Sequence, residues 1–215
     1  MHSDCKKRRS FVALLFAAVD LRHYRGDTMQ INEKFLRITE ETNAIDYLEK
    51  TAFYLEESKS SDIAWKWVTI SLHGALYGFA IAASSGTDSR SVLRKNGKLL
   101  SIWDAIKRCE DPTIMCTLVH AKALTLTHDQ RESIQKLTSL LRNDFSHFTP
   151  KSWSIELHGL PQISLEVLEV INFLCFETKT YILLDPDLRE ETKTIIDSCT
   201  GIIKNLFLYK ESLLL

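Results

Sequence analysis

The stretch SSDIAWKWVTISLHGALYGFAIAASSG, residues 60–86, is apolar nearly all round, and its length approaches that of a membrane span. Its first three residues supply N-cap chemistry, and Gly86 supplies a stop. Four polar or small residues interrupt the apolar surface: Lys66, His73, Gly74 and Gly78. Because the other helical segments of the chain are strongly amphipathic, this stretch predicts the buried central helix of a helical bundle rather than a span.

Helical patterns flank this stretch on both sides. Residues 31–57 form an amphipathic segment before it. Its apolar residues recur at helical spacing: Phe35, Ile38, Ala44, Leu48, Ala52 and Leu55. After it, a short helix begins with Ser101 and Asp104 in a capping box and ends at Pro112. A longer segment begins with a second box, formed by Thr127 and Gln130, and stops before Pro150.

The C-terminal third predicts two further helices after a short extended connector, residues 151–161. One helix covers residues 164–184, and the last follows Asp185-Pro186 and runs to about Tyr209, with proline in its first position. The chain has seven glycines, four prolines and no sustained run of strands among its 215 residues. The fold class is therefore expected to be all-α, a helical bundle with short irregular connectors.

The N-terminal residues 1–28 are expected to be an arm or an upstream extension, and residues 29–215 a single domain. Met29 opens a sequence that is typical of a protein start. The apolar run 11–19 resembles a secretory signal, but it is too short for a bilayer span, and charged residues follow it directly. Secretion remains the alternative to a cytoplasmic location.

The five cysteines are odd in number and widely spread, which is typical of reduced thiols in a cytoplasmic protein. Cys109 and Cys116 are the closest pair, and no second metal-like pair completes a zinc site. The prediction is therefore that the protein binds no metal and needs no cofactor. No membrane partner is expected either.

The formal net charge of -1 provides no global field, so a polyanion would have to meet a local basic patch. SRSVLRKNGK, residues 89–98, carries four cations and no acidic residue. Either it is a solvated loop, or it contacts nucleic acid, since clustered uncompensated cations are what phosphate contacts require. On the second interpretation, Arg94 and Lys95 bind the substrate.

LRNDFSHF, residues 141–148, gathers an arginine, an amide and an imidazole near the end of a helical segment. On a wheel of about 100° per residue, Arg142, Asn143, Ser146 and His147 fall opposite the apolar stripe. Any amphipathic helix has such a polar face. However, a cation, a hydrogen-bonding amide and a group that titrates near neutrality are also what phosphodiester chemistry needs.

The RNDFSH segment resembles the R-polar-x-x-x-H signature of the HEPN superfamily, and the resemblance covers residues 29 to 184. The stretches 65–78 and 141–161 resemble its plasmid- and defence-associated branch. The resemblance implies an all-α HEPN-like domain that acts as a homodimer and cleaves RNA without a metal. It implies His147 as general acid/base, Arg142 as the phosphate-binding cation and Asn143 as the orienting residue. Ser146 and Lys151 are candidate phosphate-binding residues beside them.

The expected activity is that of a toxin or phage-defence ribonuclease that leaves 2′,3′-cyclic phosphate ends. RNA would be its substrate, and an antitoxin or regulatory protein a further partner. The alternative is a non-catalytic module of the same fold that binds RNA, a nucleotide or a protein.

Overall fold

The computed structural model describes residues 35–85, 88–116, 121–141, 145, 154–178 and 186–214. Within these ranges the chain forms helices and no strand, apart from one isolated antiparallel bridge between Leu93 and Leu99. The predicted all-α fold class is therefore confirmed. The chain divides into two units, Met1–Arg37 and Ile38–Leu215, and every described helix belongs to the second unit.

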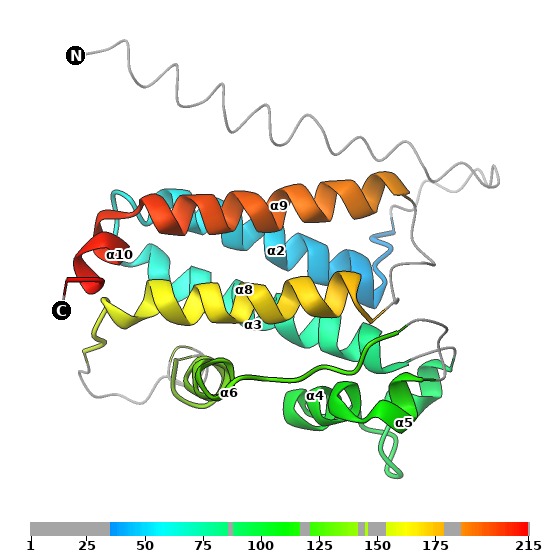
Figure 1. The fold of residues 1–215 in the computed structure, drawn as a ribbon. Coiled ribbons are helices and arrows are strands. Elements are labelled where there is room, and N and C mark those ends of the chain that lie inside the picture. The colour runs from blue at the N-terminus through cyan, green and yellow to red at the C-terminus, as the bar shows by residue number, and fades with distance from the viewer. Residues whose placement is uncertain are drawn as a thin grey trace. The chain divides into compact units, whose positions relative to one another are not determined.

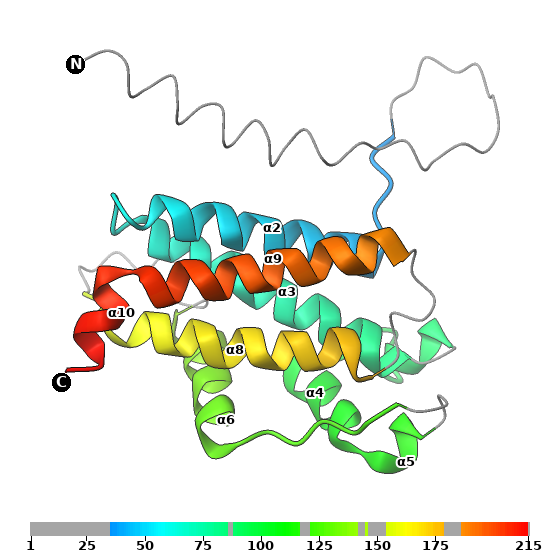
Figure 2. The ribbon, with the colours of Figure 1, turned by 45° about the horizontal axis from the view of Figure 1, so that its top comes forward.

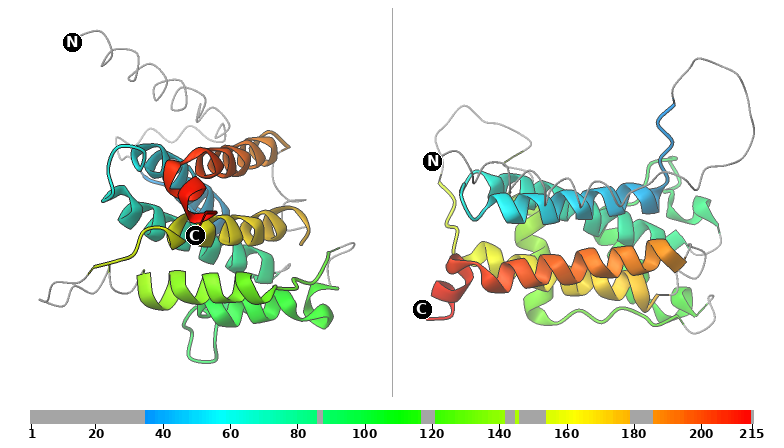
Figure 3. Two further views of the ribbon diagram at one scale, coloured as in Figure 1. Left: turned by 60° about the vertical axis from the view of Figure 1, so that its left-hand side comes forward. Right: turned by 90° about the horizontal axis from the view of Figure 1, so that it is seen from above.

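Four long helices form the body of the second unit (Figure 1): α2 (Glu40–Glu57), α3 (Ala64–Ser85), α8 (Gly159–Phe176) and α9 (Pro186–Asn205). They pack in a closed ring, α2 on α3, α3 on α8, α8 on α9 and α9 back on α2. Figures 2 and 3 show α9 running alongside both α2 and α8. The helices α3 and α8 run in the same direction, and α2 and α9 run opposite to them.

Because α3 and α8 are parallel, the chain must return along the bundle between them, and it does so by a long crossover of the kind seen in some four-helix bundles. The crossover contains η1 (Ser89–Val92), α4 (Ile102–Glu110), α5 (Pro112–Met115), α6 (His128–Gln135) and η2 (Lys136–Leu141). It is not loose chain, since α4 and η2 pack on α3 and α6 packs on α8. The candidate functional residues of the sequence lie in this crossover.

Helix α3 is the buried central helix that its sequence predicts. Its fully buried side chains include Leu72, Leu76 and Phe79. Gly74 and Gly78, which seemed in the sequence to interrupt the helix, are instead where α2 packs closely against it. A Cβ on Gly74 would lie 2.6 Å from the Tyr47 ring, and one on Gly78 would lie 2.7 Å from the Ala44 Cβ.

The first helix is shorter than predicted. It begins at Glu40, because Thr39 caps it and forms a capping box with Thr42. Residues 35–39 have no regular structure, and Phe35 and Ile38 are exposed rather than part of the apolar helix face. The prediction used only the spacing of the apolar residues, so it started the helix before the capping signal at Thr39.

The bounds of two other helices differ from prediction. Helix α8 begins at Gly159 and ends at Phe176, whereas residues 164–184 were expected to be helical. In the connector before it, residues 154–158 are irregular. The last helix does begin at Pro186, but it breaks at Leu206, after which α10 (Phe207–Ser212) follows.

Helices α3 and α8 are each long and apolar enough to cross a membrane. More than half of the apolar window of each helix is nevertheless buried inside the bundle, as in the core helices of a water-soluble protein.

Candidate nucleic-acid interface

Helix α6, which leads toward the Arg142–His147 motif, is fixed at its start. The predicted capping box is present, with Thr127 and Gln130 bonded reciprocally at 3.1 Å. Gln130 also donates to Glu169 on α8 at 3.1 Å. Arg131 forms an ion pair with Glu110 on α4, at 2.5 Å. These contacts hold the first turns of α6 against two neighbouring elements.

Beyond Gln135 the helix becomes π-helical, in η2. Ile134 and Leu137 are buried as predicted, but Thr138, which is polar, is buried as well. Its hydroxyl donates to the Gln135 carbonyl at 3.3 Å. Because a π-helix bonds residue i to i+5, a wheel drawn at α-helical spacing does not carry through this segment. The α-helical wheel therefore applies only as far as Gln135.

The five predicted residues of the motif and its surroundings lie outside the described residues: Arg142, Asn143, Ser146, His147 and Lys151. Their catalytic and substrate-binding roles remain predictions. Of the site residues that the sequence predicts, Arg94 and Lys95 can be placed in the structure.

Arg94 and Lys95 belong to a β-turn that protrudes between η1 and α4, and we call residues Leu93–Leu99 the basic tongue. The Arg94 N–H donates to the Lys98 carbonyl at 2.7 Å, and the Gly97 N–H donates to the Arg94 carbonyl at 2.8 Å. Gly97 has a φ of 74°, which closes a three-residue hairpin loop. The tongue is thus a defined turn rather than an open loop.

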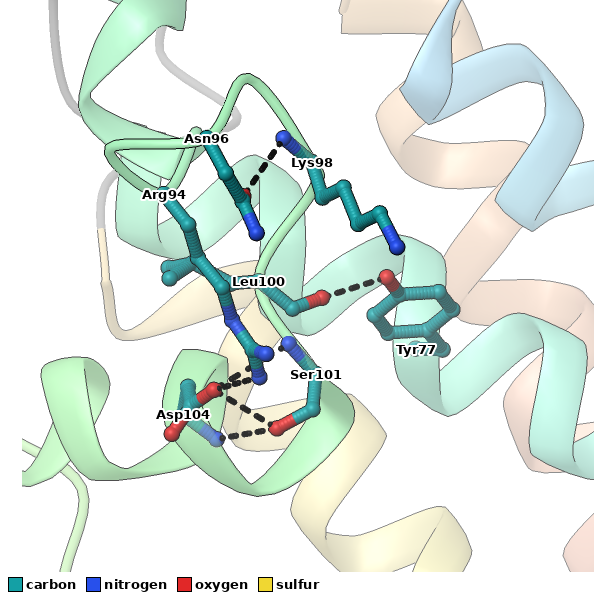
Figure 4. Close-up of polar contacts among 7 residues, drawn as sticks. All are labelled: Tyr77, Arg94, Asn96, Lys98, Leu100, Ser101 and Asp104. Atoms are coloured by element: carbon teal, nitrogen blue, oxygen red, sulfur yellow. Dashed lines mark hydrogen bonds and ion pairs between the residues drawn. The ribbon is translucent and has the colours of Figure 1, made fainter.

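The base of the tongue is tied to α3 and α4 (Figure 4). The Tyr77 hydroxyl donates to the Leu100 carbonyl at 2.6 Å. The Arg94 guanidinium forms an ion pair with Asp104, the residue that completes the predicted capping box of α4 with Ser101. The pKa of Asp104 lies below its usual value. The hydrogen bond from the Ser101 hydroxyl lowers it most, and the hydrogen bond from Arg94 lowers it further.

The four cations of residues 89–98 fall into two groups, the arginines, which form ion pairs, and the lysines, which do not pair with a described carboxylate. Arg90 pairs with Asp88 at 3.2 Å, and Arg94 pairs with Asp104. The prediction that the four cations of residues 89–98 have no compensating acid was therefore wrong for the two arginines. Their partners, Asp88 and Asp104, lie outside that stretch. Lys95 and Lys98 are exposed and form no ion pair with any carboxylate in the described part of the chain.

The sequence reasoning missed the anchoring roles of Tyr77 and Asp104, and it left Lys98 out of the site. The Ser101–Asp104 capping box was visible in the sequence. Its link to Arg94, ten residues earlier, depends on the turn and has no local sequence signal.

Cys109 on α4 and Cys116, the C-cap of α5, differ in their surroundings. Cys109 is buried, its thiol lies 3.6 Å from the Ala80 carbonyl, and burial raises its pKa to about 12. Cys116 is exposed and lies 3.2 Å from the Thr113 carbonyl. Among the residues the structure describes, no group of three or more histidine, cysteine or acidic side chains is placed to hold a metal.

Searches of protein-family models, curated proteins and solved structures found no match to this chain.

Proposed function

We propose that this chain is a metal-independent endoribonuclease of HEPN type, acting as a homodimeric toxin or phage-defence effector in the cytoplasm. The observation that carries the proposal is the Arg142-Asn143-x-x-x-His147 motif, which directly follows the α6–η2 helix of an all-α bundle. The fixed start of α6 supports it, since a site that handles phosphate needs a rigid support.

The chemistry follows from the residue types. His147 as general base takes the proton of an RNA 2′-hydroxyl, whose oxygen attacks the adjacent phosphorus. The bond to the 5′-oxygen breaks, and that oxygen leaves with a proton from the imidazolium of a second His147 or of the same one. Arg142 stabilises the charge that develops on the phosphorane, and Asn143 orients the reacting groups. The products are a 2′,3′-cyclic phosphate and a 5′-hydroxyl.

The sequence predicts four further substrate-binding residues: Ser146 and Lys151 beside the motif, and Arg94 and Lys95 on the basic tongue, where Arg94 is paired with Asp104. DNA is not a substrate in this mechanism, because it lacks the 2′-hydroxyl nucleophile. No step requires a bound metal ion, so cleavage should persist in excess EDTA.

The test compares the wild-type protein with His147→Ala and Arg142→Ala on total RNA and on tRNA, in excess EDTA. His128→Ala is the matched control, because His128 is an exposed histidine at the start of the same helical segment and has no proposed role. The expected result is cleavage by wild type and His128→Ala, with 2′,3′-cyclic phosphate ends, and none by the other two variants.

Absence of cleavage by a confirmed wild-type dimer would contradict the ribonuclease assignment. RNA binding that persisted in that case would favour the alternative, a non-catalytic module of the same fold. Cleavage by His147→Ala at the wild-type rate would exclude the proposed site even if the protein is a nuclease.

A further inference from the structure

The two lysines of the basic tongue differ from the arginines around them. Arg90 and Arg94 have their charge satisfied by Asp88 and Asp104. Lys95 is the first residue of the three-residue loop, and Lys98 is the first residue after it; both side chains are exposed. Each ammonium group can therefore meet an external anion without first breaking an ion pair with a described carboxylate.

The turn that carries these lysines is held in one conformation by several independent bonds. Two backbone hydrogen bonds close the loop, and the Asn96 side chain accepts from the Lys98 N–H at 3.1 Å. Below the loop, Tyr77 and the Arg94–Asp104 pair tie its base to α3 and α4. A pre-ordered turn loses less conformational entropy on binding than a free loop would.

We propose that the basic tongue binds the phosphate backbone of single-stranded RNA through Lys95 and Lys98, with Arg94 serving to position the turn. The proposal rests on the ribonuclease function and assigns to it a substrate contact outside the motif. It also gives different roles to the two residues predicted from sequence. Lys95 contacts phosphate, whereas Arg94 holds the turn in place through its ion pair with Asp104.

Phosphate is the ligand that fits this surface. Lysine ammonium groups act as mobile point charges, which suits a flexible backbone of regularly spaced anions. Leu93 and Leu99 pair with each other across the base of the turn and are 45% and 43% exposed, so apolar surface lies beside the charges for sugars or bases to contact.

The experiment measures the dissociation constant for a labelled single-stranded 2′-O-methyl RNA by fluorescence anisotropy, from 50 to 200 mM KCl. The modified RNA cannot be cleaved by 2′-hydroxyl attack, so binding is read separately from catalysis. The test variant is Lys95→Ala with Lys98→Ala. The control is Lys204→Ala with Lys210→Ala, which removes the same charge from two exposed lysines of α9 and α10.

Loss of two phosphate contacts should lower the slope of log affinity against log salt by about 1.4 for a single strand. Across the fourfold salt range, wild type should then lose about sevenfold more affinity than the tongue variant does. The control pair should keep the wild-type slope. An unchanged slope in the tongue variant, or an equal change in the control, would overturn the proposal.

Tyr77→Phe tests the positioning role without changing any charge. It removes the hydroxyl that bonds Leu100 and keeps the ring, so affinity should fall by up to about fivefold while the salt slope stays at the wild-type value. A changed salt slope in Tyr77→Phe would contradict the proposal that Tyr77 only positions the turn while the two lysines contact phosphate.

Competition with poly-L-glutamate separates RNA from an acidic protein as the ligand. Displacement of the RNA at equal charge concentration would overturn the choice of nucleic acid.

Cleavage of unmodified RNA is assayed alongside. If the tongue variant still cleaves RNA and its salt slope equals that of wild type, this inference alone is overturned. If the wild-type protein binds RNA but does not cleave it, the ribonuclease proposal is overturned instead.

Discussion

At the scale of single residues, Gly78 determines how closely α2 approaches α3. A Cβ at this position would lie 2.7 Å from the Ala44 Cβ and 3.3 Å from its Cα, so the contact involves backbone that a rotamer change cannot move. Gly78→Ala should therefore lower the free energy of unfolding by about 1–3 kcal/mol, as overpacking of a core does. Urea denaturation followed by circular dichroism measures this change.

Gly201→Ala is the matched control for that prediction. Gly201 lies within α9, and a Cβ there would meet nothing within 4 Å. The same substitution should stabilise the protein by about 0.5–1 kcal/mol, because alanine loses less conformational freedom in a helix. Equal effects at both positions would mean that the α2–α3 contact does not limit the packing.

Individual residues also show what the sequence could and could not predict. The Ser101–Asp104 and Thr127–Gln130 capping boxes were predicted, since each depends on residues three positions apart. The Arg94–Asp104 pair was not, because a folded turn brings the two side chains together. The motif residues lie outside the described part of the chain, and their geometry stays a prediction.

At the scale of helices, two like charges meet where α2 packs on α9. Glu49 is half-buried, and its pKa is raised by burial, by Glu191 on α9 and by Asp46, against an opposing effect of Lys50. A raised folded-state pKa means that the folded protein holds this proton more tightly than the unfolded chain does. The stabilising effect is present below the ordinary glutamate pKa and is lost as pH rises through the folded-state value.

Glu49→Gln should therefore raise the melting temperature at neutral pH and flatten its decline in the pH range just above 4.5. Glu190→Gln, an exposed position of α9, is the control and should leave that decline in place. Thermal melts between pH 4 and 8 measure both variants. A Glu49→Gln curve parallel to wild type would show that the charges do not interact appreciably.

The π-helical segment η2 marks where element-scale prediction from sequence failed. Apolar spacing at Ile134 and Leu137 fitted an α-helix, and both are buried. Nothing in Lys136–Leu141 itself signals an i to i+5 pattern, and the segment packs against α3. The motif follows this segment directly, and π-helical turns occur frequently at functional sites.

Deletion of Ser139 should remove the extra residue of the π turn and restore α-helical spacing. The downstream residues, including Arg142 and His147, would then rotate by about 100° relative to α3. RNA cleavage should be lost while circular dichroism shows unchanged helicity. Ser139→Ala keeps the residue count and should retain cleavage. Full activity in the deletion variant would show that the π segment does not set the position of the motif.

At the scale of the whole molecule, the crossover carries both proposed RNA contacts, whereas the closed ring of α2, α3, α8 and α9 supports them. A single chain supplies one Arg142–His147 motif, and the proposed mechanism pairs two of them in a homodimer. Light scattering should therefore give a mass twice the 24.7 kDa of the chain.

Cleavage per chain should fall on dilution once the protein concentration drops below the dimer dissociation constant, because the composite site is lost with the dimer. Arg142→Ala and His147→Ala should abolish cleavage and keep the dimer mass, since both residues would act on the phosphate rather than hold the subunits together. A monomeric mass for either variant would assign that residue to the interface. Cleavage per chain that stays constant while the mass falls to that of a monomer would mean that one motif is sufficient.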